Sequence, residues 1–164
     1  PRGRLWCVPF ARAVTGVDLR GNAKTWWHQA KGRYERGNEP QIGAVMTFSG
    51  SRSMPRGHVA VVSKVLSDRE VLIDHSNWST IDGRRGHVER GARVIDVSEK
   101  GDWSKVRVWH AGSRDMGQTS YPVSGFIYND GTVHFAAAPK MDHGFKLSEP
   151  VTEFHACSTG GLSG

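Results

Sequence analysis

Apolar and polar positions alternate along much of the chain between residues 43 and 110. Runs rich in β-branched residues, each bounded by turn-forming residues, predict strands at residues 43–48, 58–65, 70–78, 92–98 and 105–110. The segment SDRE between the second and third runs predicts a tight hairpin. In that hairpin the two strands meet near Val65 and Val71.

Two segments before residue 43 have helical spacing instead. Residues 7–14 form the first predicted helix, because Pro9 suits a first turn and Gly16 suits a stop. The second covers residues 23–31, with Asn22 as its N-cap. Two helices followed by an antiparallel sheet of about five or six strands predict an α+β domain.

The pattern weakens after residue 112. We therefore expect a domain over residues 1–112 and a C-terminal extension without an assigned role over residues 113–164. Within the extension, the segment GFIYNDGTVHF predicts a hairpin, and the final CSTGGLSG is expected to be disordered.

The composition is that of a globular protein, with 37% hydrophobic residues among 164 and a net charge of +6. The basic residues are scattered, which disfavours nucleic acid as a partner and suits attraction to a polyanionic surface such as a cell wall. No apolar run approaches the length of a membrane span, so no transmembrane segment is expected. The chain begins at Pro1 and shows no signal peptide.

The two cysteines, Cys7 and Cys157, leave three interpretations open for Cys7. It is a small buried residue, half of a single Cys7–Cys157 bridge, or a nucleophile. A thiol at a helix N-terminus faces unpaired N–H groups and the positive end of the helix dipole, and both favour the reactive thiolate.

A nucleophilic cysteine needs a base, and two of the eight histidines are suitably placed. His58 opens a predicted strand directly after Gly57. His75 lies in the strand EVLIDHSNW, where the period of two places it on one face with Ile73 and Asn77. If the two strands pair through SDRE, His58, His75 and Asn77 become neighbours.

The Cys7 helix, the strand GHVAVVSKV and the segment IDHSNW, in this order, resemble the CHAP family of cysteine- and histidine-dependent amidohydrolases and peptidases, whose fold is papain-like. The segment GNAKTWW followed by GAVMTF fits the same family. The resemblance implies Cys7 as nucleophile, His58 as base, and His75 or Asn77 as the third catalytic residue. It implies no metal and no cofactor.

Two positions depart from the family pattern. Many relatives carry glutamine or a small polar residue before the cysteine, where this chain has Trp6. The third position holds a histidine where relatives commonly have a carboxylate, and a neutral imidazole orients the base less strongly than an anion.

The family mostly cleaves peptidoglycan, so the resemblance implies an amidase or endopeptidase of the periplasm or cell exterior, acting through a thioester. Trp78, Trp6 and Arg56 are candidates to bind that substrate. One alternative is a non-catalytic cell-wall or partner-binding module on the same fold. Another is a metal site at Cys7, His58 and His75, whose spacing matches no common zinc pattern.

Overall fold

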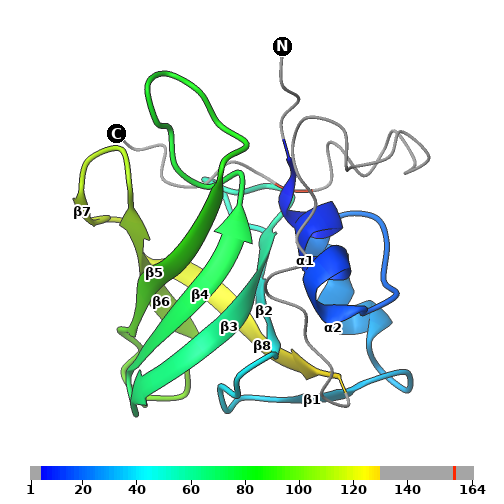
Figure 1. The fold of residues 1–164 in the computed structure, drawn as a ribbon. Helices are drawn as coiled ribbons and strands as arrows, with labels where there is room; N and C mark the ends of the chain where they lie inside the picture. The colour runs from blue at the N-terminus through cyan, green and yellow to red at the C-terminus, as the bar shows by residue number, and fades with distance from the viewer. Residues whose placement is uncertain (1–4, 130–156, 158–164) are drawn as a thin grey trace.

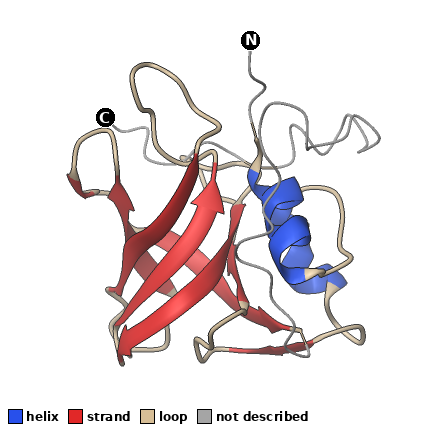
Figure 2. Cartoon of the chain, in the orientation of Figure 1, coloured by secondary structure: helices blue, strands red, loops and turns tan. Residues whose placement is uncertain are grey.

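A computed structural model describes residues 5–129 and Cys157, and β-structure dominates it (Figures 1 and 2). Helix α1 (Cys7–Thr15) comes first, followed by the 3-10 turn η1 (Ala23–Thr25) and the short helix α2 (Trp26–Gln29). The strands are β1 (Glu35–Gly37), β2 (Val45–Phe48), β3 (His58–Ser67), β4 (Glu70–Ser76), β5 (Val88–Asp96), β6 (Lys105–His110), β7 (Asp115–Met116) and β8 (Tyr121–Tyr128).

The strands form one antiparallel sheet in the order β1-β8-β2-β3-β4-β5-β6-β7. An additional pairing between β8 and β6 closes β2, β3, β4, β5, β6 and β8 into a six-stranded barrel. Closure leaves these strands without free edges, which otherwise invite pairing with other chains. The predicted α+β class is thus confirmed in part, because the sheet is larger than expected and closed.

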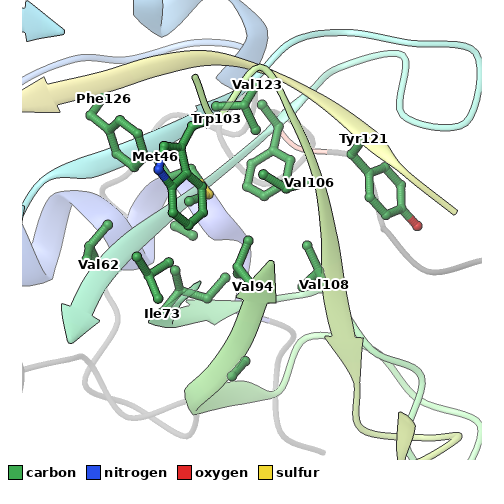
Figure 3. Packing of buried hydrophobic residues seen from close by; sticks show 14 of the residues in the cluster. Met46, Val62, Ile73, Val94, Trp103, Val106, Val108, Tyr121, Val123 and Phe126 are labelled. Atoms are coloured by element: carbon green, nitrogen blue, oxygen red, sulfur yellow. The ribbon is translucent and has the colours of Figure 1, made fainter. Parts of the chain in front are cut away.

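The barrel interior is filled by alternate side chains of its strands (Figure 3). On β3, Ala60 and Val62 face inward, and Val59 and Val61 belong to a second cluster beneath the helices. The labelled interior residues in Figure 3 include Met46, Ile73, Val94, Trp103, Val106 and Phe126. Burial on both faces explains why "HVAVV" is almost continuously apolar.

Helix α1 packs against the outside of the barrel beside β3 and β4 (Figure 1). It buries Phe10, Ala11 and Val14 in the outer cluster, together with Trp26 from α2. The predicted helix at residues 23–31 divides into η1 and α2, because its first turn closes through the i→i+3 bond from Trp26 N–H to the Ala23 carbonyl. Gly16 ends α1 at φ 72°, in the left-handed conformation expected of a helix stop.

The hairpin register around SDRE is confirmed, since Val65 lies opposite Val71. The expected division at residue 112 needs correction, because β8 lies between β2 and β6 in the same sheet as the N-terminal strands. The first half of the hairpin predicted in GFIYNDGTVHF falls within β8, and Pro122 and Gly125 interrupt the strand periodicity of "YPVSGFIY", which hid the earlier part of this strand in the sequence. The second half of the hairpin predicted near residues 129–131 and the predicted disorder of the chain end lie outside the described residues, apart from Cys157.

No helix among the described residues is both long and apolar enough to cross a membrane.

Candidate active site

A tight turn at Gly57 positions His58 at the start of β3. Gly57 has φ 71°, and a Cβ at this position would lie 2.5 Å from the Phe48 carbonyl oxygen and 2.8 Å from the Lys24 amide nitrogen. Only glycine fits there, so the loop after β2 can pass close to η1 before β3 begins. His58 then starts β3 with a fully buried side chain.

His75 meets His58 at the same end of the barrel. Strand β4 ends where β3 begins, and the His58 Nε2 atom lies 3.0 Å from the His75 Nδ1 atom. The bond joins two imidazoles that are both fully buried. The expectation that the strand pairing brings these two side chains together is therefore met.

Aromatic side chains surround the two histidines. Trp78 packs against both, with ring centroids 4.7 Å from His58 and 5.6 Å from His75, and Phe48 lies 5.3 Å from His58. Trp78 is only 1% exposed. It covers the histidine pair, and its burial leaves it almost no exposed surface for the substrate contact for which it was a candidate.

Burial controls the protonation of the pair. Desolvation, reinforced by the neighbouring His75, holds the pKa of His58 well below its ordinary value. Desolvation also lowers the pKa of His75, against the opposing charges of Glu89 and Asp74. Both imidazoles are therefore neutral at neutral pH, and His58 is available as a base.

Cys7 is the first residue of α1 and is completely buried. Its sulfur is bonded to that of Cys157, with the two Cα atoms 6.0 Å apart. Of the three interpretations of Cys7 that the sequence left open, the structure thus has the Cys7–Cys157 bridge, and the expectation of a free thiol at Cys7 is wrong for this structure. A separation of 150 residues carries no local signal of pairing.

The sulfur of Cys157 also occupies the start of α1. The Val8 N–H donates a hydrogen bond to the Cys157 Sγ atom at 3.3 Å. The first N–H groups of a helix have no partner within it and attract electron-rich atoms. Cys157 thus uses one of the backbone donors that a developing oxyanion at Cys7 would otherwise meet.

The His58 Nδ1 atom is buried and has no hydrogen-bond partner among the described residues. Because Nε2 is taken by His75, Nδ1 is the nitrogen left for a nucleophile. With Cys7 bonded to Cys157, no hydrogen bond joins the cysteine to this atom. Within residues 5–129 and Cys157, no three histidine, cysteine or acidic side chains are arranged to hold a metal ion.

The remaining predicted residues lie around this pair. Asn77 follows β4 at φ 63°, its N–H donates to the His87 carbonyl, and both polar side-chain atoms are buried without a partner in the described residues. Trp6 is the half-buried N-cap of α1, and its side chain makes no capping hydrogen bond. Arg56 is exposed in the loop before His58, and its carbonyl accepts a bond from the Lys24 N–H.

Sequence reasoning missed Glu89. It lies on β5 opposite His75, and its Oε1 atom is 3.9 Å from the His75 Nε2 atom. The strand was expected to start at residue 92, so Glu89 fell in the loop before it. If the strand had been predicted to start at Val88 and run through "VERGARVID", the prediction would have placed a carboxylate beside His75.

The structure thus combines a cysteine at a helix start with a buried histidine pair at the adjoining end of an antiparallel sheet. Residues 1–77 match the family model of the CHAP domain. The match confirms the resemblance drawn from the sequence over the part of the chain that contains Cys7, His58, His75 and Asn77. CHAP domains are generally hydrolase domains with papain-like folds, and the closed barrel and helix packing of this chain differ from that fold in detail. A search of curated proteins found no match.

Proposed function

We propose that this protein hydrolyses an amide bond of peptidoglycan, with Cys7 as nucleophile and His58 as base. The observation that carries the proposal is the hydrogen bond between His58 and His75, which leaves one nitrogen of a neutral imidazole unpaired at the end of the barrel where α1 begins. The family match supports the substrate class.

The bridge to Cys157 must open before Cys7 can react. A thiol reductant gives two electrons to the disulfide, each sulfur gains a proton, and the reductant becomes a disulfide itself. Reduction also releases the Val8 N–H from the sulfur of Cys157. The disulfide form is therefore a resting state, and the thiol form is the active one.

In the thiol form, Nδ1 of His58 takes the proton of Cys7 as the sulfur attacks the amide carbonyl carbon. Backbone N–H groups at the start of α1 stabilise the oxyanion. His58 then protonates the leaving amine, and water hydrolyses the thioester. His75 holds the His58 ring in place throughout.

A location in the cell envelope fits both the substrate and the disulfide. Disulfides persist in oxidising compartments such as the periplasm or the cell exterior and are rare in the cytosol. The bond that is cut is either the N-acetylmuramoyl-L-alanine amide or a peptide bond of the stem or cross-bridge. The fragments released on digestion distinguish between them.

The decisive experiment is mass spectrometry of purified sacculi digested by the Cys157→Ser variant, in which Cys7 is the only cysteine. We expect soluble fragments that bear a new amine and identify the bond. The matched control carries Cys7→Ala as well and releases nothing. Wild-type protein is expected to act only with reductant present.

A second candidate is a non-catalytic binding module, which the bonded, buried state of Cys7 favours. In that case the bridge is structural. Sedimentation of the protein with sacculi, without any released fragment from Cys157→Ser, would support this function and contradict the enzymatic one.

A further inference from the structure

Glu89 is a buried carboxylate that the mechanism above does not use. Its side chain is 8% exposed, and its Oε1 atom faces the His75 nitrogen that lies away from His58. At 3.9 Å this pairing is longer than a hydrogen bond, so the attraction is electrostatic. His75 Nε2 is itself buried without a hydrogen-bond partner among the described residues.

Ser79 fixes the position of Glu89. The Ser79 N–H donates to Oε2 at 3.0 Å and its hydroxyl donates to Oε1 at 2.9 Å. The Ala111 N–H donates to the Ser79 oxygen at 2.9 Å. A backbone N–H can only donate, so the hydroxyl accepts this bond and directs its own proton to Glu89.

The proton positions of both histidines follow from this series of hydrogen bonds through Ser79 to Glu89. Oε1 of Glu89 accepts the Ser79 proton, so the neutral imidazole of His75 is favoured with its proton on Nε2, toward the carboxylate. His75 Nδ1 is then an acceptor, and His58 Nε2 must donate the bond between the two rings. His58 Nδ1 is left with a lone pair.

We infer that Glu89 is a positioning residue that sets the tautomers of His75 and His58 so that His58 presents an unprotonated Nδ1 to Cys7. This inference rests on the function proposed above. Glu89 does not take up the proton of Cys7, which stays on His58 until the amine leaves. The negative charge that neither His75 nor Asn77 carries is thus supplied by Glu89 on the next strand, which faces His75 and not the base itself.

Other charges around His75 do not satisfy the same geometry. His58 on β3 approaches Nδ1, and Asp74 precedes His75 on β4. Each carboxylate oxygen of Asp74 already accepts another hydrogen bond, Oδ2 from the Arg90 side chain and Oδ1 from the Gly91 N–H. Asp74→Asn is therefore a matched control, because it removes a nearby negative charge and leaves Glu89 in place.

The test is ring ¹⁵N NMR of the histidines at neutral pH, in Cys157→Ser and in the same protein with Glu89→Gln or Asp74→Asn. We expect Cys157→Ser to show His75 and His58 both protonated on Nε2. Glu89→Gln introduces an amide that can donate to His75, so we expect the Nδ1–H form of His75 to appear. Asp74→Asn should retain the original tautomers.

A kinetic readout accompanies the spectra. Alkylation of Cys7 by iodoacetamide should slow about 10- to 100-fold in Glu89→Gln and change little in Asp74→Asn. Peptidoglycan cleavage should fall in kcat with KM little changed. A neutral His58 protonated on Nδ1 alone in Cys157→Ser would overturn the inference without any Glu89 variant, so it stays testable even if Glu89→Gln fails to fold.

Unchanged tautomers and alkylation rate in a folded Glu89→Gln would overturn it as well. Neither measurement uses a substrate. A protein with the expected tautomers that cuts no sacculi would fail only the proposed function.

Discussion

The Ser76 hydroxyl donates a hydrogen bond to the Leu5 carbonyl at 2.9 Å, joining the end of β4 to the segment just before Cys7. His75 and Ser76 are neighbours on β4, so their side chains point to opposite faces of the strand. One face carries the histidine, and the other binds the segment that leads to Cys7. The bond is buried and fixes the helix start relative to the histidine pair.

Replacing Ser76 with alanine should therefore destabilise the protein. The Leu5 carbonyl loses its donor in a buried setting, at a cost of about 1–3 kcal/mol in the free energy of unfolding. Urea denaturation measures it. Ser113→Ala, which removes an exposed hydroxyl, is the control and should change stability by less than about 0.5 kcal/mol. Equal effects of the two substitutions would argue against the role of Ser76.

The third catalytic position can be assigned by comparing His75 and Asn77. In the Cys157→Ser protein, His75→Ala should lower kcat/KM on sacculi about 100-fold or more, since His58 loses the partner that orients it. Asn77→Gly removes the other side chain and suits φ 63°, so it should have a much smaller effect. The reverse order would assign the orienting role to Asn77.

Gly57 should tolerate no side chain. Gly57→Ala places a methyl group against the Phe48 carbonyl and the Lys24 backbone, and we expect a loss of more than about 2 kcal/mol in unfolding free energy. Gly83→Ala is matched, because Gly83 has φ 74° with no atom within 4 Å of the added methyl, and should cost only about 1 kcal/mol. Thermal or urea denaturation of both variants measures the two losses in unfolding free energy. Their difference reports the contact with the Phe48 carbonyl and the Lys24 backbone, because both variants share the backbone strain. Similar losses would show that the close approach is unimportant.

Stability should fall as the solution becomes acidic. The pKa values of His58 and His75 are lower in the folded protein than in the unfolded chain, so the unfolded state binds more protons below about pH 6.5. Their contribution is complete above that pH and decreases toward the folded pKa, by up to about 1.4 kcal/mol per histidine per pH unit.

Urea denaturation of the non-reduced protein between pH 7.5 and pH 5 measures this slope. His58→Gln should flatten it, and His28→Gln, at an exposed position on α2, should leave it unchanged. A slope that His58→Gln does not alter would mean that burial of the pair does not oppose protonation.

The sequence predicted the parts of the molecule that depend on local periodicity. Alternation in "EVLIDHSNW" placed His75 on the inner face of its strand, and the short turn after Ser67 fixed the register that brings it to His58. Helix signals at Pro9 and Gly16 placed Cys7 at the start of α1.

Features that depend on contacts between residues far apart in the sequence were not predicted. Strand β8 closes the barrel by contacts with β2 and β6, and Pro122 and Gly125 weaken its own signal. Glu89 reaches His75 only after the β4–β5 register includes a bulge between Ile73 and His75. The Cys7–Cys157 bond depends on where the chain returns in space, which no local pattern encodes.

The same bond gives the chain a ring topology. Every residue from Cys7 to Cys157 lies on one covalent loop. A single backbone cut between residues 8 and 156 therefore separates nothing while the protein is oxidised, and both pieces migrate as one species on a denaturing gel without reductant. Adding reductant resolves the nicked chain into two fragments in the same step that frees the Cys7 sulfur.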